Sequence, residues 1–188
     1  MSDASDFWVF AYGSLMWRPG FEHVEHVTAH LPGARRALCV WSFVHRGTRE
    51  RPGLVLGLDR GGSCRGVAYR VAEERRDEVV AYLRERELVT DVYREVMRPI
   101  RLDRPDRPTV TALTFVVDRG HHQYAGRLPP EVILRHVRDS EGRSGANADY
   151  VINTVRHMRS LGFRDPVLEK VAAALIAEGR GAERPASG

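Results

Sequence analysis

The chain has 188 residues, 43% of them hydrophobic and 29% charged, so it can bury a core without the support of a metal or a disulfide. Its formal net charge of +4 comes from arginine, because Lys170 is the sole lysine. Acidic residues interrupt the arginines in stretches such as 73–78, which indicates a solvated helix face rather than a nucleic-acid-binding stripe. No apolar run approaches the ~20 residues of a membrane span, and the polar start MSDASD lacks the pattern of a signal peptide, so we expect a cytoplasmic protein with no nucleic-acid and no membrane partner.

The first predicted element is a strand over residues 7–11, FWVFA, because an uninterrupted apolar run is typical of a strand buried on both faces. The run ends at Tyr12-Gly13-Ser14-Leu15. Glycine tolerates backbone angles that other residues resist and lets a ligand approach the chain closely. Two interpretations of this loop are open: an ordinary tight turn, or a cradle of backbone N–H groups for an anion such as a carboxylate.

Histidines and cysteines are the next candidates for chemistry. His23, His26 and His30 lack a helical two-histidine spacing with a nearby carboxylate, which favours scattered surface histidines over a metal site. Cys39 and Cys64 have no C-x-x-C spacing and fall in predicted strands, which favours two buried free thiols in a reducing compartment over a catalytic cysteine. We therefore expect no metal and no other cofactor.

Strands precede helices along the rest of the chain. The predicted strands cover residues 36–45, 53–59, 64–71, 92–102 and 109–117, with a turn over 60–63. The predicted helices cover residues 72–87, a segment starting at Pro129-Pro130, 147–161, and 167–178 after a capping Asp165. This order predicts an α+β fold with a mixed or antiparallel sheet rather than a doubly wound one. We expect one domain over residues 1–188, with a core at about 7–178 and a flexible tail over 179–188.

Carboxylates remain after the common catalytic motifs are excluded, since the chain has no dinucleotide- or phosphate-binding glycine motif, no H-E-x-x-H and no G-x-S-x-G. Glu87 ends the predicted helix in the sequence Arg84-Glu85-Arg86-Glu87. A carboxylate at a helix C-terminus opposes the helix dipole, and partial burial would raise its pKa toward that of a general base. The other interpretation is a pair of exposed glutamates that pair with neighbouring arginines.

Six stretches of the sequence, in order over residues 7–162, resemble the ChaC branch of the γ-glutamylcyclotransferase-like family. They are VFAYGSLMWRPGF, the segment with Trp41-Ser42 and His45-Arg46-Gly47, CRGVAYRV, YLRERELVTDVY, Tyr124-Ala125-Gly126 and SGANADYV. The resemblance implies a small mixed β-barrel or sheet with peripheral helices. It also implies cyclisation of a γ-glutamyl group to 5-oxoproline, with glutathione as the usual substrate.

The resemblance also implies roles for particular residues: a γ-glutamyl-binding loop, a catalytic acid/base and a substrate-contacting tyrosine. In this chain these are Tyr12, Gly13, Ser14 and Leu15, then Glu87, then Tyr124. Arg46 is a further substrate-binding candidate, because a guanidinium suits a carboxylate. The segment 88–93 has the longer form found in many bacterial-type members, which leaves the contacts to the cysteinylglycine end open. No protein nucleophile is expected, because the substrate's own α-amine attacks its γ-carbonyl carbon.

Alternative functions share this loop and carboxylate. One is a cyclotransferase for γ-glutamyl amines or γ-glutamyl amino acids, because the predicted residues address only the γ-glutamyl half of a substrate. Another is a non-catalytic γ-glutamyl-binding protein, against which the presence of Glu87 argues. Nucleic-acid binding rests on the basic charge alone.

Overall fold

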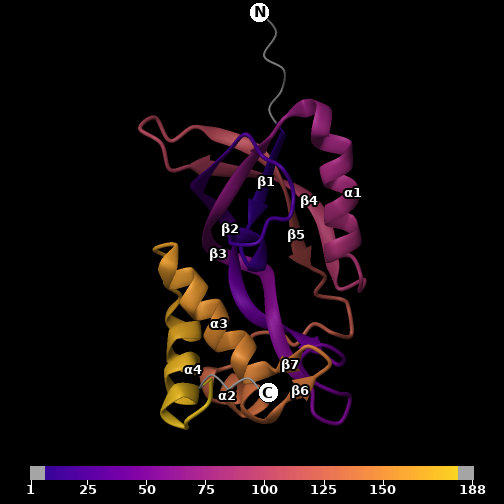
Figure 1. Ribbon diagram of the computed structural model, residues 1–188, viewed down its shortest axis with the longest axis vertical. Helices are drawn as coiled ribbons and strands as arrows, with labels where there is room; N and C mark the ends of the chain where they lie inside the picture. The colour runs from indigo at the N-terminus through magenta and orange to yellow at the C-terminus, as the bar shows by residue number, and fades with distance from the viewer. Residues whose placement is uncertain (1–6, 182–188) are drawn as a thin grey trace, which may run out of the picture. The chain divides into compact units, whose positions relative to one another are not determined.

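The computed structural model describes residues 7–181, and these form two compact units (Figure 1). The first comprises residues 7–37 and 56–124, and the second comprises residues 38–55 and 125–181. The predicted flexible tail lies in part, over 182–188, outside the described residues.

A closed barrel of five strands forms the first unit, in the order β1-β3-β2-β4-β5. The strands are β1 (Phe7–Ala11), β2 (Glu25–Ser42), β3 (Gly53–Val71), β4 (Tyr93–Leu102) and β5 (Thr109–Val117), and the ends of β2 and β3 over 38–42 and 53–55 belong to the second unit. Strand β1 is antiparallel to β3, with Phe7 opposite Val71, and parallel to β5, with Trp8 opposite Ala112. The sheet is therefore mixed, and the parallel pair closes it.

The predicted burial of strand β1 on both faces is confirmed. All five of its residues are buried, and Val9 and Ala11 have no exposed surface. The strand has hydrogen-bonded neighbours on both sides, so neither edge is open to water. The loop that follows β1 thus starts from a rigid, buried element.

Strand β2 is longer than predicted, since it begins at Glu25 rather than at residue 36 and ends at Ser42 rather than at 45. Its first half contains histidines and the pair Pro32-Gly33, which favour a loop in the sequence. Pairing with β4, where Ala29 lies opposite Leu102, makes this segment a strand. Tertiary pairing here overrides local propensity.

The predicted turn over residues 60–63 is wrong as a strand boundary, because β3 continues through it. Gly61 and Gly62 have φ values of 98° and 69°, which only glycine adopts easily. These two residues therefore change the direction of the strand without ending it.

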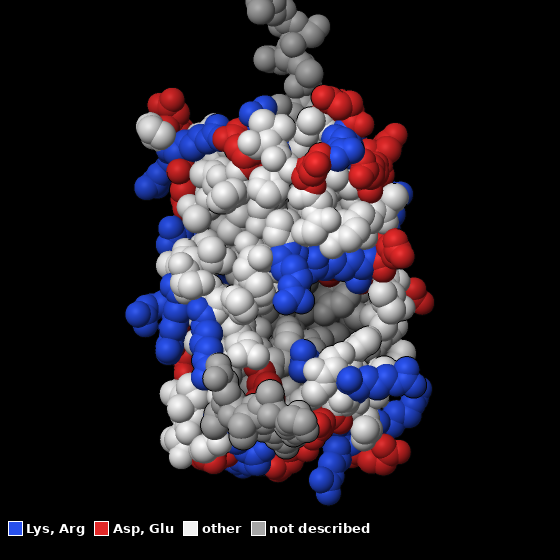
Figure 2. Space-filling view, in the orientation of Figure 1, with Lys and Arg blue, Asp and Glu red and all other residues white. Residues whose placement is uncertain are grey.

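Helix α1 (Arg76–Glu87) follows a short 3-10 turn, η2 (Glu73–Arg75), and runs along one side of the barrel (Figure 1). It buries Val79 and Leu83. Arg75 at the end of η2 forms an ion pair with Glu78 of α1 at 3.0 Å, and acidic and basic side chains are interspersed around the helix in Figure 2. The predicted helix and its solvated face are both confirmed.

The second unit contains three helices that pack on one another: α2 (Pro130–Asp139), α3 (Asn147–Ser160) and α4 (Pro166–Ala177). A two-stranded hairpin of β6 (Glu141–Gly142) and β7 (Gly145–Ala146), which the sequence pattern does not predict, joins α2 to α3. Asn147 is fully buried at the start of α3, where its side chain exchanges two hydrogen bonds with the backbone of Leu54 at 2.7 and 2.8 Å. This amide ties α3 to the end of β3.

Replacement of the predicted capping residue Asp165 by alanine is expected to lower the free energy of unfolding by about 1 kcal/mol. Its carboxylate accepts the backbone N–H groups of Val167 and Leu168 at 3.1 Å each, and alanine leaves these donors without that acceptor. Urea unfolding of the wild type and of Asp165→Ala measures the loss. Asp165→Asn is the control, because asparagine retains an acceptor oxygen, and equal midpoints for all three proteins would contradict the cap.

The predicted α+β class with a small, mixed, barrel-like sheet is confirmed by the five-stranded barrel and helices α1–α4. Cys39 and Cys64 are buried free thiols, as expected. No helix within residues 7–181 has the length and apolar character that crossing a membrane requires.

Candidate functional site

The predicted γ-glutamyl-binding loop leaves the end of β1 and passes into a 3-10 turn, η1 (Ser14–Met16). The side chains of Tyr12 and Leu15 are buried, whereas Ser14 is exposed and Gly13 is half-exposed. The two ends of the loop are therefore anchored in the core, and its middle lies at the surface.

Gly13 is not required for the packing of the first unit. Its φ is −125°, and a Cβ atom built on it would meet only Leu56 Cδ1 within 4 Å, at the ordinary contact distance of 3.9 Å. Glycine at this position also leaves space for the close approach of a ligand.

Three successive backbone N–H groups of the loop form no hydrogen bond within the protein over residues 7–181. Within residues 7–181, the N–H groups of Gly13, Ser14 and Leu15 donate to no protein acceptor, whereas the N–H of Met16 donates to the carbonyl of Gly13 at 2.9 Å. Adjacent N–H groups in a surface loop suit a carboxylate or a developing oxyanion. The loop is a tight turn whose first N–H groups have no protein acceptor among residues 7–181, and its use as an anion cradle stays a prediction.

The carbonyl groups of the same loop are held by side chains from other strands. Arg36 Nε donates to the carbonyl of Tyr12 at 2.5 Å. The Tyr69 hydroxyl lies 2.7 Å from the carbonyl oxygen of Met16 and 3.1 Å from that of Leu15. Because these donors fix the carbonyl side of the loop, its N–H side is held in place as well.

Arg36 was not identified from the sequence, although its position contains a signal. It shares the buried face of β2 with Leu38 and Val40, where an arginine is unusual. Only 9% of its surface is exposed, and it also donates to the carbonyl of Arg65 at 2.7 Å. It has no carboxylate partner among the described residues, so carbonyl oxygens and the Met16 sulfur, 3.7 Å from Nη2, accept the hydrogen bonds of this buried cation.

Tyr69→Phe is expected to lower the free energy of unfolding by about 1–3 kcal/mol, because it leaves buried carbonyl groups of the loop without a donor. Burial raises the pKa of Tyr69 to about 12, so its hydroxyl stays protonated at neutral pH and can donate. Denaturant unfolding measures the effect. Tyr93→Phe is the control, since the hydroxyl of Tyr93 donates to the carbonyl of Leu56 at 2.7 Å and not to the loop. An unchanged unfolding midpoint in Tyr69→Phe would contradict the anchoring role.

Glu87 is the last residue of α1, and 20% of its side chain is exposed. Burial raises the pKa of its carboxyl above the ordinary value of 4.5, and the charge of Arg86 opposes this rise. Of the two interpretations of this residue, the structure supports the half-buried carboxylate with a raised pKa rather than the exposed ion-pair partner. A raised pKa moves a carboxyl toward the range in which it can both take and return a proton during catalysis.

Arg86 joins the loop to the end of α1. Its Nη2 donates to Ser14 Oγ at 3.0 Å, and its Nε lies 3.4 Å from Glu87 Oε1. The structure therefore brings the predicted loop and the predicted acid/base into one place in the first unit.

Tyr124 is held by a buried carboxylate of the first unit. Its hydroxyl donates to Asp59 Oδ2 at 3.1 Å, and Asp59 also binds Arg35 at 2.7 Å and Arg119 at 2.8 Å. Burial alone would raise the pKa of Asp59, but hydrogen bonds from Arg119, the Arg60 N–H and Tyr124 hold it below its usual value. Asp59 is therefore an anion that orients the tyrosine, while the substrate contact of Tyr124 stays a prediction.

Arg46 belongs to the second unit, where it is half-buried. Its Nη1 lies 3.4 Å from the carbonyl oxygen of Ala146, and its guanidinium stands over the ring of Tyr150 at 5.4 Å from the centroid. These contacts orient the side chain, and its binding of a substrate carboxylate stays a prediction.

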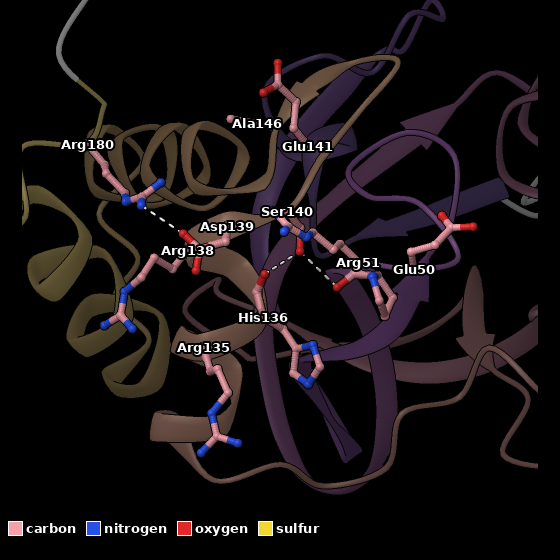
Figure 3. A pocket seen from close by; sticks show the side chains of 11 residues that line it. Glu50, Arg51, Arg135, His136, Arg138, Asp139, Ser140, Glu141, Ala146 and Arg180 are labelled. Atoms are coloured by element: carbon pink, nitrogen blue, oxygen red, sulfur yellow. Dashed lines mark hydrogen bonds and ion pairs between the residues drawn. The ribbon is translucent and has the colours of Figure 1, made fainter.

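The second unit also contains a cavity of about 480 Å³, lined in part by arginines (Figure 3). Arg138 binds Glu178 through two hydrogen bonds of 2.6 and 2.9 Å, and Arg180 binds Asp139 at 3.0 Å. None of the seven residues predicted for the site lines this cavity. The candidate site therefore rests on the loop and the end of α1.

Comparison with known proteins gives consistent matches over most of the chain. The model of the family described as "ChaC-like protein" matches residues 7–178. A "Glutathione-specific gamma-glutamylcyclotransferase" of Escherichia coli (strain K12) is 36% identical over 163 residues, which cover 87% of this chain and 70% of that protein. A "Glutathione-specific gamma-glutamylcyclotransferase 1" of Mus musculus is 35% identical over 179 residues, which cover 92% of this chain and 79% of that protein.

A solved structure has the same fold. The crystal structure of a yeast γ-glutamyl cyclotransferase specific to glutathione aligns with a TM-score of 0.78 at 17% identity and covers 96% of this chain and 100% of its own. At that identity the likeness bears on the fold alone. Because the family model spans nearly all of the described residues and the sequence relatives exceed 30% identity, this chain belongs to the ChaC-like protein family.

Proposed function

We propose that this protein is a γ-glutamylcyclotransferase that converts glutathione to 5-oxoproline and cysteinylglycine. The observation that carries the proposal is the juxtaposition, through Arg86, of a loop with unpaired N–H donors and the half-buried carboxylate of Glu87. The relatives named as glutathione-specific cyclotransferases support the choice of substrate.

The reaction is an intramolecular aminolysis. The α-amine nitrogen of the γ-glutamyl group forms a bond to its own γ-carbonyl carbon, and the bond from that carbon to the cysteine nitrogen breaks. The ammonium nitrogen gives up two protons as it becomes the lactam N–H, and the cysteine nitrogen takes up two as it leaves and becomes an ammonium group. Glu87 accepts a proton from the attacking nitrogen and returns one to the departing nitrogen. A single carboxyl group with a raised pKa can perform both transfers.

The larger contribution comes from holding the γ-glutamyl chain folded, since well-oriented intramolecular reactions reach effective molarities of ~10⁵–10⁸ M. We assign this task to the loop of Tyr12, Gly13, Ser14 and Leu15. Within residues 7–181 the N–H groups of Gly13, Ser14 and Leu15 have no protein acceptor, and they would bind the anionic end of the γ-glutamyl group. Arg46 and Tyr124 are proposed as further contacts to the substrate.

An end-point assay with reduced glutathione tests the proposal, with 5-oxoproline and cysteinylglycine as the measured products. γ-Glutamyl-alanine and a γ-glutamyl amine in parallel reactions separate a glutathione enzyme from a cyclotransferase of other specificity. We expect equimolar products from glutathione and much slower release from the other two. Failure of a folded wild-type protein to release 5-oxoproline from any of them would support a non-catalytic binding protein instead.

We also propose a cytoplasmic location. The two buried free thiols, Cys39 and Cys64, suit a reducing compartment, and so does a substrate that is itself a thiol. Fractionation of cells that express the native protein, with antibody detection, tests this location.

A further inference from the structure

Arg86 makes an unusual set of contacts for a surface arginine at the end of a helix. Its Nη1 donates to the carbonyl of Arg18 at 2.6 Å, to that of Pro19 at 3.3 Å and to the Tyr82 hydroxyl at 3.0 Å. Its Nη2 donates to Ser14 Oγ at 3.0 Å. One guanidinium thus holds both the start and the end of the segment 14–19.

Arg84, one position earlier in the same Arg-Glu repeat, behaves differently. Its side chain is 57% exposed and makes a two-point ion pair with Glu95 at 2.6 and 3.0 Å. The side chain of Arg86 is only 21% exposed, and most of its donors go to uncharged oxygens of the loop. The helix therefore carries two arginines of different kinds, one of which pairs with a carboxylate while the other binds the loop.

The charge of Arg86 lies beside Glu87, with Nε 3.4 Å from Oε1. Among the described residues, Arg86 is the charged group that acts on this carboxyl, and the neighbouring Tyr82 hydroxyl is bound to Arg86 itself. A nearby cation favours the ionised form of a carboxyl, and burial favours the neutral form. Arg86 thereby limits how far burial can raise the pKa of Glu87.

We propose that Arg86 is a positioning residue that couples the loop over residues 14–19 to the acid/base Glu87. This inference rests on the proposed function and deepens it. The planar fork of the guanidinium holds the loop at a set distance from the end of α1, and its charge favours the ionised form of Glu87, which can accept a proton from the substrate ammonium. Substrate binding and proton transfer then depend on one side chain.

Three variants separate these tasks: Arg86→Met removes fork and charge, Arg86→Lys keeps the charge without the fork, and Arg84→Met is the matched control on the same helix. For Arg86→Met we expect KM for glutathione to rise about tenfold or more, since a hydrogen bond to a charged group contributes roughly 1.5–3 kcal/mol. The acid limb of its pH–rate profile should also move to higher pH. Arg86→Lys should raise KM while the limb stays near that of the wild type, and Arg84→Met should change neither.

A measurement without substrate makes the result independent of activity. Proteins labelled with ¹³C in the glutamate carboxyl groups are titrated by NMR, and the signal missing in Glu87→Gln identifies Glu87. We expect the pH midpoint of the Glu87 titration to rise in Arg86→Met and to stay unchanged in Arg84→Met. Unchanged KM and midpoint in a folded Arg86→Met protein would overturn the coupling. An inactive wild type with the expected midpoint shift would overturn the proposed function and leave the electrostatic link between Arg86 and Glu87 standing.

Discussion

Glu87→Gln is expected to retain the fold and substrate binding and to lose about 10²–10⁴-fold in turnover, the usual contribution of a general acid/base. Glutamine has nearly the same shape and cannot accept or return the proton. Initial rates of 5-oxoproline release, with binding measured by calorimetry, test both parts of this expectation.

Glu85→Gln is the matched control for this experiment. It makes the same chemical change two positions earlier on α1, where the side chain is exposed, so its turnover should equal that of the wild type. Full activity in Glu87→Gln, or equal losses in both variants, would remove Glu87 from the mechanism.

The stability of Glu87→Gln gives an independent check. Because burial raises the pKa of Glu87 in the folded state, the stability linked to its protonation is fully present below the ordinary value of 4.5 and is lost as pH rises through the raised pKa. Above that raised pKa the folded protein holds Glu87 as a carboxylate in surroundings that favour the neutral carboxyl group. Glu87→Gln should be at least as stable as the wild type at pH 7, and a clearly lower melting temperature would attribute its lost activity to misfolding.

Gly13→Val is expected to weaken substrate binding by roughly 10- to 100-fold with a much smaller effect on folding, since about 1.5–3 kcal/mol is the contribution of a hydrogen bond to a charged group. The built Cβ meets Leu56 at only 3.9 Å, so the protein itself has room for it. The added side chain would lie beside the unpaired N–H groups that we assign to the substrate. Calorimetric affinity for glutathione, measured with Glu87→Gln in the background to prevent turnover, tests this effect.

Gly66→Val provides the contrasting control for Gly13→Val. A Cβ atom on Gly66 would lie 2.2 Å from the carbonyl oxygen of Ala11 and 2.7 Å from Phe10 Cζ, so the protein must deform to accept it. We expect this variant to lose stability, whereas Gly13→Val should lose affinity. A Gly13→Val protein with unchanged affinity would contradict the cradle.

Local pattern was sufficient for several elements. The apolar run of β1 and the change to helical spacing before Glu87 were both predicted close to the bounds observed. Each of these signals is contained within one element, because side-chain period and capping depend on neighbours in the chain. Strand β2 shows the limit, since its histidines and its Pro32-Gly33 pair suit a loop until β4 pairs with it.

The residues that hold the loop could not be found in this way. Arg36, Tyr69 and Arg86 donate to loop atoms 24, 54 and 72 positions away in the chain, respectively. Their partners are mostly backbone carbonyl groups, which carry no side-chain signature in a sequence. Only the buried-face position of Arg36 in β2 offered a hint.

By itself, the sequence determined the α+β class, the loop of Tyr12 to Leu15, the end of α1 at Glu87 and the likeness to ChaC proteins, because these depend on local pattern and motif order. The tertiary structure decided that Glu87 is a partly buried carboxylate and showed which N–H groups of the loop lack a protein acceptor within residues 7–181, while the anion cradle stays a prediction. Whether an N–H is unpaired and whether a carboxyl loses water depend on groups brought from distant parts of the chain. Arg86 is the clearest case, since its helix is evident in the sequence and its attachment to the loop exists only in the folded protein.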